Sequence, residues 1–75
     1  MNRFRLYLID PIFGDWTSTN HTVQVEGGMT DADVDKSLLA VFPTLNFANI
    51  STDGDDSSVY IEFDGQLVAE FRRDH

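Results

Sequence analysis

VYIEFDGQLVAEF, residues 59–71, is the stretch that decides the fold, because two apolar runs flank Asp64-Gly65 and predict a β-hairpin. A two-residue turn at Asp64-Gly65 would pair Phe63 with Gln66 and would place Glu70 on the same face as the apolar residues. We therefore expect a three-residue loop, Phe63-Asp64-Gly65, with Gly65 in the left-handed conformation. This register gathers the apolar side chains on one face, namely Val59, Ile61, Leu67, Ala69 and Phe71. The other face then carries Tyr60, Glu62, Val68 and Glu70.

Two more strands are predicted in the first third of the chain. Residues 4–9 are nearly all apolar or aromatic, as in a strand covered on both faces, and Asp10-Pro11 should end it. The composition of residues 11–21 predicts a loop. Residues 22–26 alternate between apolar and polar side chains and are followed by Gly27-Gly28, which predicts a second strand.

The middle of the chain contains one helix signal. Thr30 is a good N-cap, and Asp33 stands three residues further on, where a capping-box partner is found. The helix should run to about Phe42, because Pro43 cannot continue it. Helical spacing places one apolar stripe against the sheet, formed by Val34, Leu38, Val41 and Phe42.

Residues 45–51 carry a weaker strand pattern, and residues 52–58 are predicted as a polar loop. The element order is then β-β-α-β-β-β, which predicts an α+β fold with a mostly antiparallel sheet and one helix packed on one face. We expect a single compact domain over residues 1–75 with a thin core, because a chain of this size buries only about 60% of its unfolded surface. The other sheet face, or an edge, is left to solvent or to a partner.

Charge is distributed unevenly along this chain, whose net charge is −8. From Leu6 to Phe71 there are twelve acids and one base, Lys36, which gives this body a charge of −11. The other four bases are arginines near the two ends. The negative electrostatic potential of this body repels nucleic acid and anionic membranes and attracts a basic protein surface. We therefore expect a protein partner with a basic surface, and neither direct nucleic-acid binding nor membrane binding. The alternative explanation is that the excess acid only keeps a small protein soluble.

The sequence also limits the cellular compartment and the kinds of active or metal-binding site that we expect. No cysteine is present and no apolar run approaches the roughly 20 residues that span a membrane, so we expect a cytoplasmic protein in a host cell. His21 and His75 have no carboxylate or serine at a recognisable catalytic spacing, so we expect no enzyme and no cofactor. The loop Asp53-Gly54-Asp55-Asp56 lacks the ligand spacing of an EF-hand. A solvated loop and a protein contact are favoured there over calcium, and no metal site is expected.

The candidate partner-binding residues combine carboxylates with one aromatic anchor. Carboxylates accept paired hydrogen bonds from arginine, and aromatic rings stack on guanidinium groups. These residues also have structural explanations that need no partner. Acids in the first turn stabilise a helix, and a polar sheet face is ordinarily exposed to solvent. The candidates are Asp31, Asp33, Asp35, Asp53, Asp55, Asp56, Tyr60, Glu62, Asp64 and Glu70.

The opening Tyr7-Leu8-Ile9-Asp10-Pro11 resembles the first residues of a type I-E anti-CRISPR protein, and the chain is similar to the anti-CRISPR class in being short, acidic and free of cysteine. That class has no common fold or motif, so the resemblance assigns no site residue. It implies an inhibitor from a phage or mobile element that binds a CRISPR effector complex, covering a basic channel or mimicking nucleic acid. The alternative is a small phage structural or assembly module without inhibitory activity. Oligomeric state, target subunit and CRISPR type are left open by the sequence.

Overall fold

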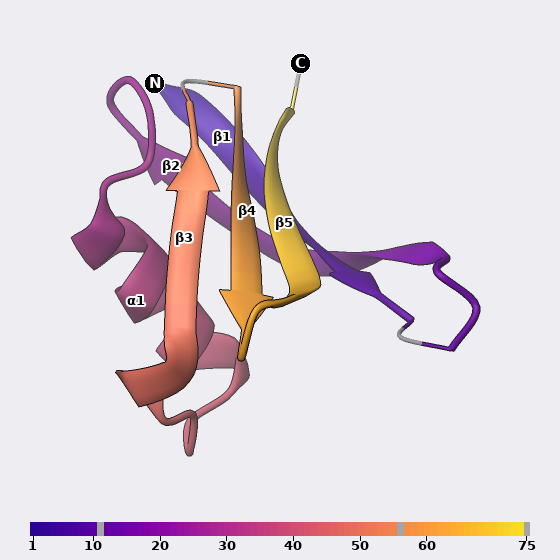
Figure 1. Ribbon diagram of the computed structural model, residues 1–75. Helices are drawn as coiled ribbons and strands as arrows, with labels where there is room; N and C mark the ends of the chain where they lie inside the picture. The colour runs from indigo at the N-terminus through magenta and orange to yellow at the C-terminus, as the bar shows by residue number, and fades with distance from the viewer. Residues whose placement is uncertain (11, 56, 75) are drawn as a thin grey trace.

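The computed structural model describes residues 1–10, 12–55 and 57–74 and contains one antiparallel sheet and one α-helix (Figure 1). Its elements in chain order are β1 (Asn2–Ile9), β2 (Trp16–Val25), α1 (Asp31–Val41), a 3-10 turn (Phe47–Asn49), β3 (Ile50–Gly54), β4 (Ser58–Phe63) and β5 (Gln66–Asp74). The predicted α+β fold and its β-β-α-β-β-β order are confirmed. The helix of this described part is not long and apolar enough to cross a membrane.

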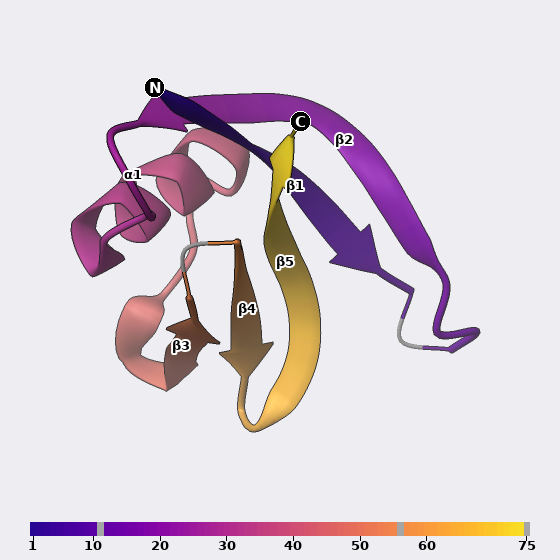
Figure 2. The same ribbon diagram turned by 90° about the horizontal axis from the view of Figure 1, so that it is seen from above.

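The five strands lie in the order β2-β1-β5-β4-β3, so β2 and β3 form the two edges of the sheet. The first and last strands are neighbours, and Arg3 stands opposite Asp74. Helix α1 lies in the connection between β2 and β3 and covers one face of the sheet (Figures 1 and 2). We call the uncovered face the open face.

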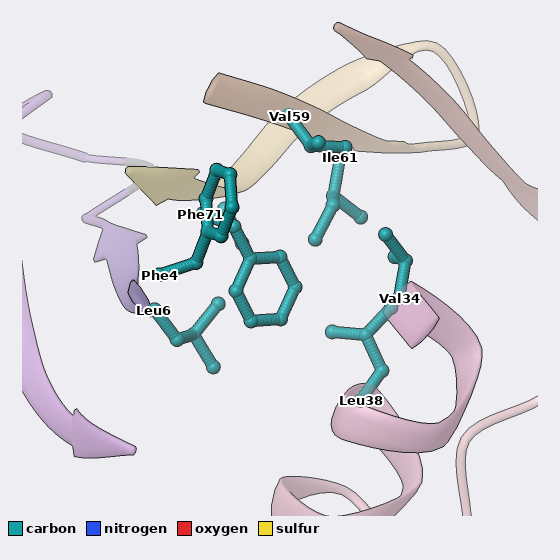
Figure 3. Close-up of a cluster of buried hydrophobic side chains, with 8 residues drawn as sticks. Phe4, Leu6, Val34, Leu38, Val59, Ile61 and Phe71 are labelled. Atoms are coloured by element: carbon teal, nitrogen blue, oxygen red, sulfur yellow. The ribbon is translucent and has the colours of Figure 1, made fainter. Parts of the chain in front are cut away.

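The core is a single layer between α1 and the sheet (Figure 3). Val34 and Leu38 of the helix point toward alternate residues of the strands, because every second side chain of a strand lies on the same face. The sheet contributes Phe4 and Leu6 from β1, Val59 and Ile61 from β4, and Ala69 and Phe71 from β5. Four of the five apolar hairpin positions predicted to share a face are therefore buried together.

The predicted three-residue hairpin loop is wrong. Phe63 pairs with Gln66, and Asp64-Gly65 alone form the turn, with φ values of 52° and 79°. Two positive φ values are the requirement of the type I′ turn, whose twist matches that of the strands it joins. In a hairpin without irregularity, this turn would place Glu70 on the same face as Ile61, which is why the sequence favours the three-residue loop.

A β-bulge removes that conflict. Ile61 pairs with Ala69, whereas Glu62 pairs with Leu67, so Val68 is an extra residue in β5. The extra residue shifts the alternation by one and keeps Glu70 on the open face. Val68 packs against the core, and Leu67 is outside it, which reverses the sequence assignment of these two residues.

The helix bounds follow the sequence prediction, and Val34 and Leu38 of the predicted apolar stripe are buried, whereas Phe42 is 38% exposed. The hydroxyl of Thr30 accepts a hydrogen bond from the Asp33 N–H at 3.2 Å, and Asp33 Oδ2 accepts one from the Thr30 N–H at 3.0 Å. This reciprocal capping box satisfies two of the helix's free donors. At the other end, the N–H of the C-cap residue Phe42 donates to the Leu38 carbonyl at 2.7 Å.

The largest departures from the predicted boundaries are in β2 and β3. Strand β2 begins at Trp16, inside the predicted loop, because residues 16–18 pair with the end of β1. A register shift follows, where the Thr19 hydroxyl donates to the Leu6 carbonyl at 2.8 Å. Residues 47–49 form a 3-10 turn, so the predicted strand over 45–51 is displaced to Ile50–Gly54, which includes part of the predicted loop.

Candidate protein-binding surface

Acids from three separate stretches of sequence meet around the edge strand β3. On the helix side, the Thr52 hydroxyl of β3 donates to Asp31 Oδ1 at 3.3 Å. Asp31 and Asp35 line a hollow of about 210 Å³ together with Ile50 and Thr52. The two carboxylates stand one helical turn apart and repel one another, so a cation placed between them lowers their repulsion.

On the open-face side of the same strand, Asp53 stands directly opposite Tyr60. The next pair on that face is Ser51 with Glu62. Tyr60 is 44% exposed, which leaves part of its ring accessible beside the two carboxylates. Alternation along the strands thus places an aromatic ring and two acids on one accessible surface.

The ends of β3 carry one more described acid each. At its C-terminal end, Asp55 Oδ1 accepts hydrogen bonds from the N–H groups of Ser57 at 2.8 Å and Ser58 at 3.2 Å. These bonds favour the ionised form and lower the pKa of Asp55 from its ordinary value of 3.8. At the other end, the Asp64 N–H donates to the Asn49 carbonyl at 3.1 Å and ties the β4–β5 turn to the start of β3.

We call this surface the acidic edge. It consists of Asp31, Asp35, Asp53, Asp55, Tyr60, Glu62 and Asp64. Seven of the ten candidate residues are therefore gathered around one strand. Asp56 was also a candidate and lies outside the described residues.

Two candidates lie elsewhere. Asp33 faces the β2 side of the helix and borders a hollow with His21, Lys36 and residues of β2. Its carboxylate is engaged in the capping box, where hydrogen bonds from Thr30, first from the backbone N–H and then from the side chain, lower the pKa of Asp33 below 3.8. Structural use of this carboxylate explains the residue without a partner.

Glu70 is the second exception, because it is only 5% exposed. It lies on the open face, where the Arg72 side chain covers it and donates from Nε to Oε1 at 2.6 Å. The same guanidinium lies 4.3 Å from the centre of the Tyr7 ring and 5.1 Å from the Trp16 ring. Glu70 is thus neutralised inside a stack of aromatic and cationic side chains, and it cannot offer a free carboxylate to a basic partner.

Three of the four arginines near the ends of the sequence, Arg3, Arg5 and Arg72, lie on the open face along β1 and β5. The pairing of these strands brings Arg5 opposite Arg72. Asp74 compensates part of their charge, with its Oδ2 at 3.4 Å from Arg3 Nε and 3.2 Å from Arg5 Nη2. The fourth, Arg73, stands opposite the core residue Phe4 on the other face and donates to Asn2 Oδ1 at 2.6 Å. The sequence places the bases at the two ends of an acidic body, whereas the fold places paired, mixed charges on β1 and β5 and the acidic edge around β3.

The described residues contain no group of three or more His, Asp or Glu side chains placed to hold a metal ion. No protein-family model, curated protein or solved structure matched the chain.

Proposed function

We propose that this protein is an inhibitor that binds the basic surface of a host nucleic-acid-handling complex through the acidic edge, with a CRISPR effector complex as the target. The observation that supports this proposal most is the convergence of acids around β3. Five of its carboxylates come from three separate stretches of sequence: Asp31 and Asp35 on α1, Asp53 and Asp55 at β3, and Glu62 on β4.

The chemistry of this surface suits an arginine-rich partner. Carboxylates accept paired hydrogen bonds from guanidinium groups, and the Tyr60 ring beside Asp53 offers a flat surface on which a guanidinium stacks. The net charge of −8 adds long-range attraction toward a basic channel and opposes approach to polyphosphate. The first residues of the chain add the resemblance to anti-CRISPR proteins.

A second use of the same acids is protection of the β3 edge. Charged side chains on an edge strand discourage pairing with another chain. That use accounts for Asp53, which stands on the strand itself. Protection of the edge requires no acid on the neighbouring helix, where Asp31 and Asp35 stand.

The alternative function is a small phage structural or assembly module without inhibitory activity. One observation favours it: Ile12 and Phe13 are exposed at the tip of the β1–β2 hairpin, where an assembly contact could bury them. An assembly module would use this apolar tip, and its activity would be insensitive to charge on the acidic edge.

The deciding experiment is phage plating on hosts with active CRISPR systems of several types, with and without this gene. The inhibitor proposal predicts that immunity is lost for at least one type and that the effector complex co-purifies with the protein. The double substitution Asp53→Arg with Glu62→Arg should abolish both effects. Glu26→Arg is the matched control, because this exposed acid follows β2 at the opposite edge.

Salt dependence and nucleic-acid binding complete the test. Association with the effector should weaken as salt rises, because exposed charges are screened beyond about 8 Å at physiological ionic strength. Duplex DNA should not bind to the protein. If no CRISPR type loses immunity and no effector complex is captured, the inhibitor proposal fails and the assembly module becomes the better account.

A further inference from the structure

The hairpin between β1 and β2 ends in a tip that exposes two large apolar side chains. Ile12 is 82% exposed and Phe13 is 78% exposed. Figure 2 shows this hairpin projecting beyond the other strands as an arm. Burying apolar side chains of this size against another surface gives a large favourable free energy. Aromatic residues are frequent anchors of protein contacts.

The described residues of the tip, Ile12 to Gly14, are hydrogen-bonded to Asp10 at the end of β1. Asp10 Oδ1 accepts hydrogen bonds from the Ile12 N–H at 2.8 Å and from the Phe13 N–H at 3.2 Å. Two backbone hydrogen bonds join the two sides of the hairpin at this point. The Gly14 N–H donates to the Asp10 carbonyl, and the Asp10 N–H donates to the Asp15 carbonyl, both at 2.8 Å. A preorganised tip loses less conformational entropy on binding than a disordered loop does.

The same chain contains an apolar hollow on the helix side of the sheet. The hollow measures about 170 Å³, and every residue that lines it is apolar. Phe42 and Leu45 after the helix form its rim with Ile50, Phe63 and Val68. A cavity of about 150 Å³ lined by apolar side chains accommodates benzene, so this hollow is large enough for the ring of a phenylalanine.

We propose that Phe13 of one copy of this chain enters the apolar hollow of a second copy, so that the protein associates with itself head to tail. The hairpin projects away from the rest of the molecule on the side opposite α1 (Figures 1 and 2), and Leu38, Phe42 and Leu45, at and after the end of α1, line the hollow. We therefore assign the tip to the hollow of another molecule and not to its own. A contact between two different surfaces of identical chains is heterologous, and repetition of it closes a ring or continues as an open chain.

The charge of the protein sets the sign of the salt dependence. Two copies carry −8 each and repel one another, and Asp15 stands beside the apolar tip. Because the contact is apolar and the repulsion is electrostatic, added salt screens the repulsion and strengthens self-association. This is opposite in sign to the salt dependence of binding to a basic partner, so the two contacts are distinguishable in one titration.

The experiment is sedimentation equilibrium of the purified full chain at low and high salt over a wide range of protein concentration. We expect oligomers that grow with concentration and with salt. Phe13→Ser should weaken the association constant at least tenfold, which corresponds to about 1.4 kcal/mol. Phe42→Ser, at the rim of the hollow, should do the same. Leu39→Ser is the matched control, because Leu39 is 43% exposed against 38% for Phe42, stands on α1 and does not line the hollow.

Mixing the two variants provides a test that misfolding cannot imitate. The Phe13→Ser chain keeps an intact hollow, and the Phe42→Ser chain keeps an intact tip. Their mixture should form a one-to-one heterodimer and nothing larger, whereas each variant alone stays monomeric. A wild-type chain that is monomeric at every concentration and salt, association that survives Phe13→Ser, or a mixture that forms no heterodimer would each overturn the proposal.

A further outcome separates the two proposals of function and self-association. If the wild-type chain is monomeric and Phe13→Ser abolishes capture of the effector complex, the tip belongs to the partner contact and self-docking is overturned. The acidic-edge variants Asp53→Arg and Glu62→Arg leave the tip and the hollow intact. Their failure to affect effector binding would count against the proposed function alone.

Discussion

Glu70 and Arg72 stand two residues apart on β5, and the guanidinium Nε of Arg72 lies 2.6 Å from Oε1 of the buried Glu70 carboxylate. Adjacent even-numbered positions of a strand share a face, so the sequence itself places these two side chains together. The Tyr7 ring of β1 completes the arrangement beneath the guanidinium, at 4.3 Å. A charge buried at this position is tolerated because its partner is supplied by the same strand.

Removing the guanidinium should destabilise the fold. Arg72→Met leaves Glu70 buried without its partner and is expected to lower the free energy of unfolding by about 1–3 kcal/mol. The double substitution Glu70→Gln with Arg72→Met should recover part of that loss, because no charge is then left buried. Urea denaturation of the three proteins gives the comparison. Equal stability of Arg72→Met and wild type would show that the pair contributes nothing.

The bulge in β5 leads to a prediction about Leu67. Because Leu67 is outside the core, Leu67→Ala should cost about 1 kcal/mol or less. Ile61→Ala, at a fully buried position that faces α1, should cost about 2–5 kcal/mol. Equilibrium unfolding of both variants measures the difference. A large loss for Leu67→Ala would support the three-residue loop in place of the bulge.

The type I′ turn makes Gly65 sensitive to substitution. Gly65 has a φ of 79°, a left-handed conformation that costs a residue with a Cβ about 1–2 kcal/mol. Gly65→Ala should therefore destabilise the protein by that amount, although open space surrounds the added Cβ. Asp64→Asn should be neutral or stabilising, because asparagine followed by glycine is favoured in this turn. Thermal melts of the two variants should shift in these different directions.

Acid should weaken the fold through Asp33 and Asp55. Hydrogen bonds to their ionised forms lower both pKa values below 3.8 in the folded chain. The stabilisation from each carboxylate is complete above the pKa of the unfolded chain and is lost as the pH falls through the lower folded pKa. We therefore expect the Tm to decrease below about pH 4.

Asp33→Asn isolates the helix contribution to this pH dependence. The amide keeps the shape of the side chain and removes its charge, so the Tm at neutral pH should be lower than that of wild type. The gap between the two proteins should narrow as the pH falls below about 4. Asp35→Asn removes an equal charge outside the capping box and serves as the reference. A gap that stays constant across this range would contradict the role given to Asp33.

Local sequence patterns predict the features that depend only on residues close together in the chain. The Thr30 capping box, the stop before Pro43, and the alternation of Val59, Ile61 and Phe71 toward the core all follow from local geometry. The element order followed from the same patterns. These features hold because helix and strand periodicities are fixed by the backbone, whatever the rest of the chain does.

Contacts between residues far apart in the sequence became visible only in the folded chain. Local geometry is compatible with a two-residue or a three-residue loop in the last hairpin. The two-residue turn matches the twist of the strands, and the bulge at Val68 allows it while Ala69 and Phe71 stay in the core. The pairing of Tyr7 with Glu70 depends on the strand order, which no local pattern encodes. The approach of Asp31 on α1 to Thr52 on β3, close to Asp53, likewise depends on how distant elements pack. Strand order is set by burial of the whole apolar face against α1, a collective property of side chains far apart in sequence.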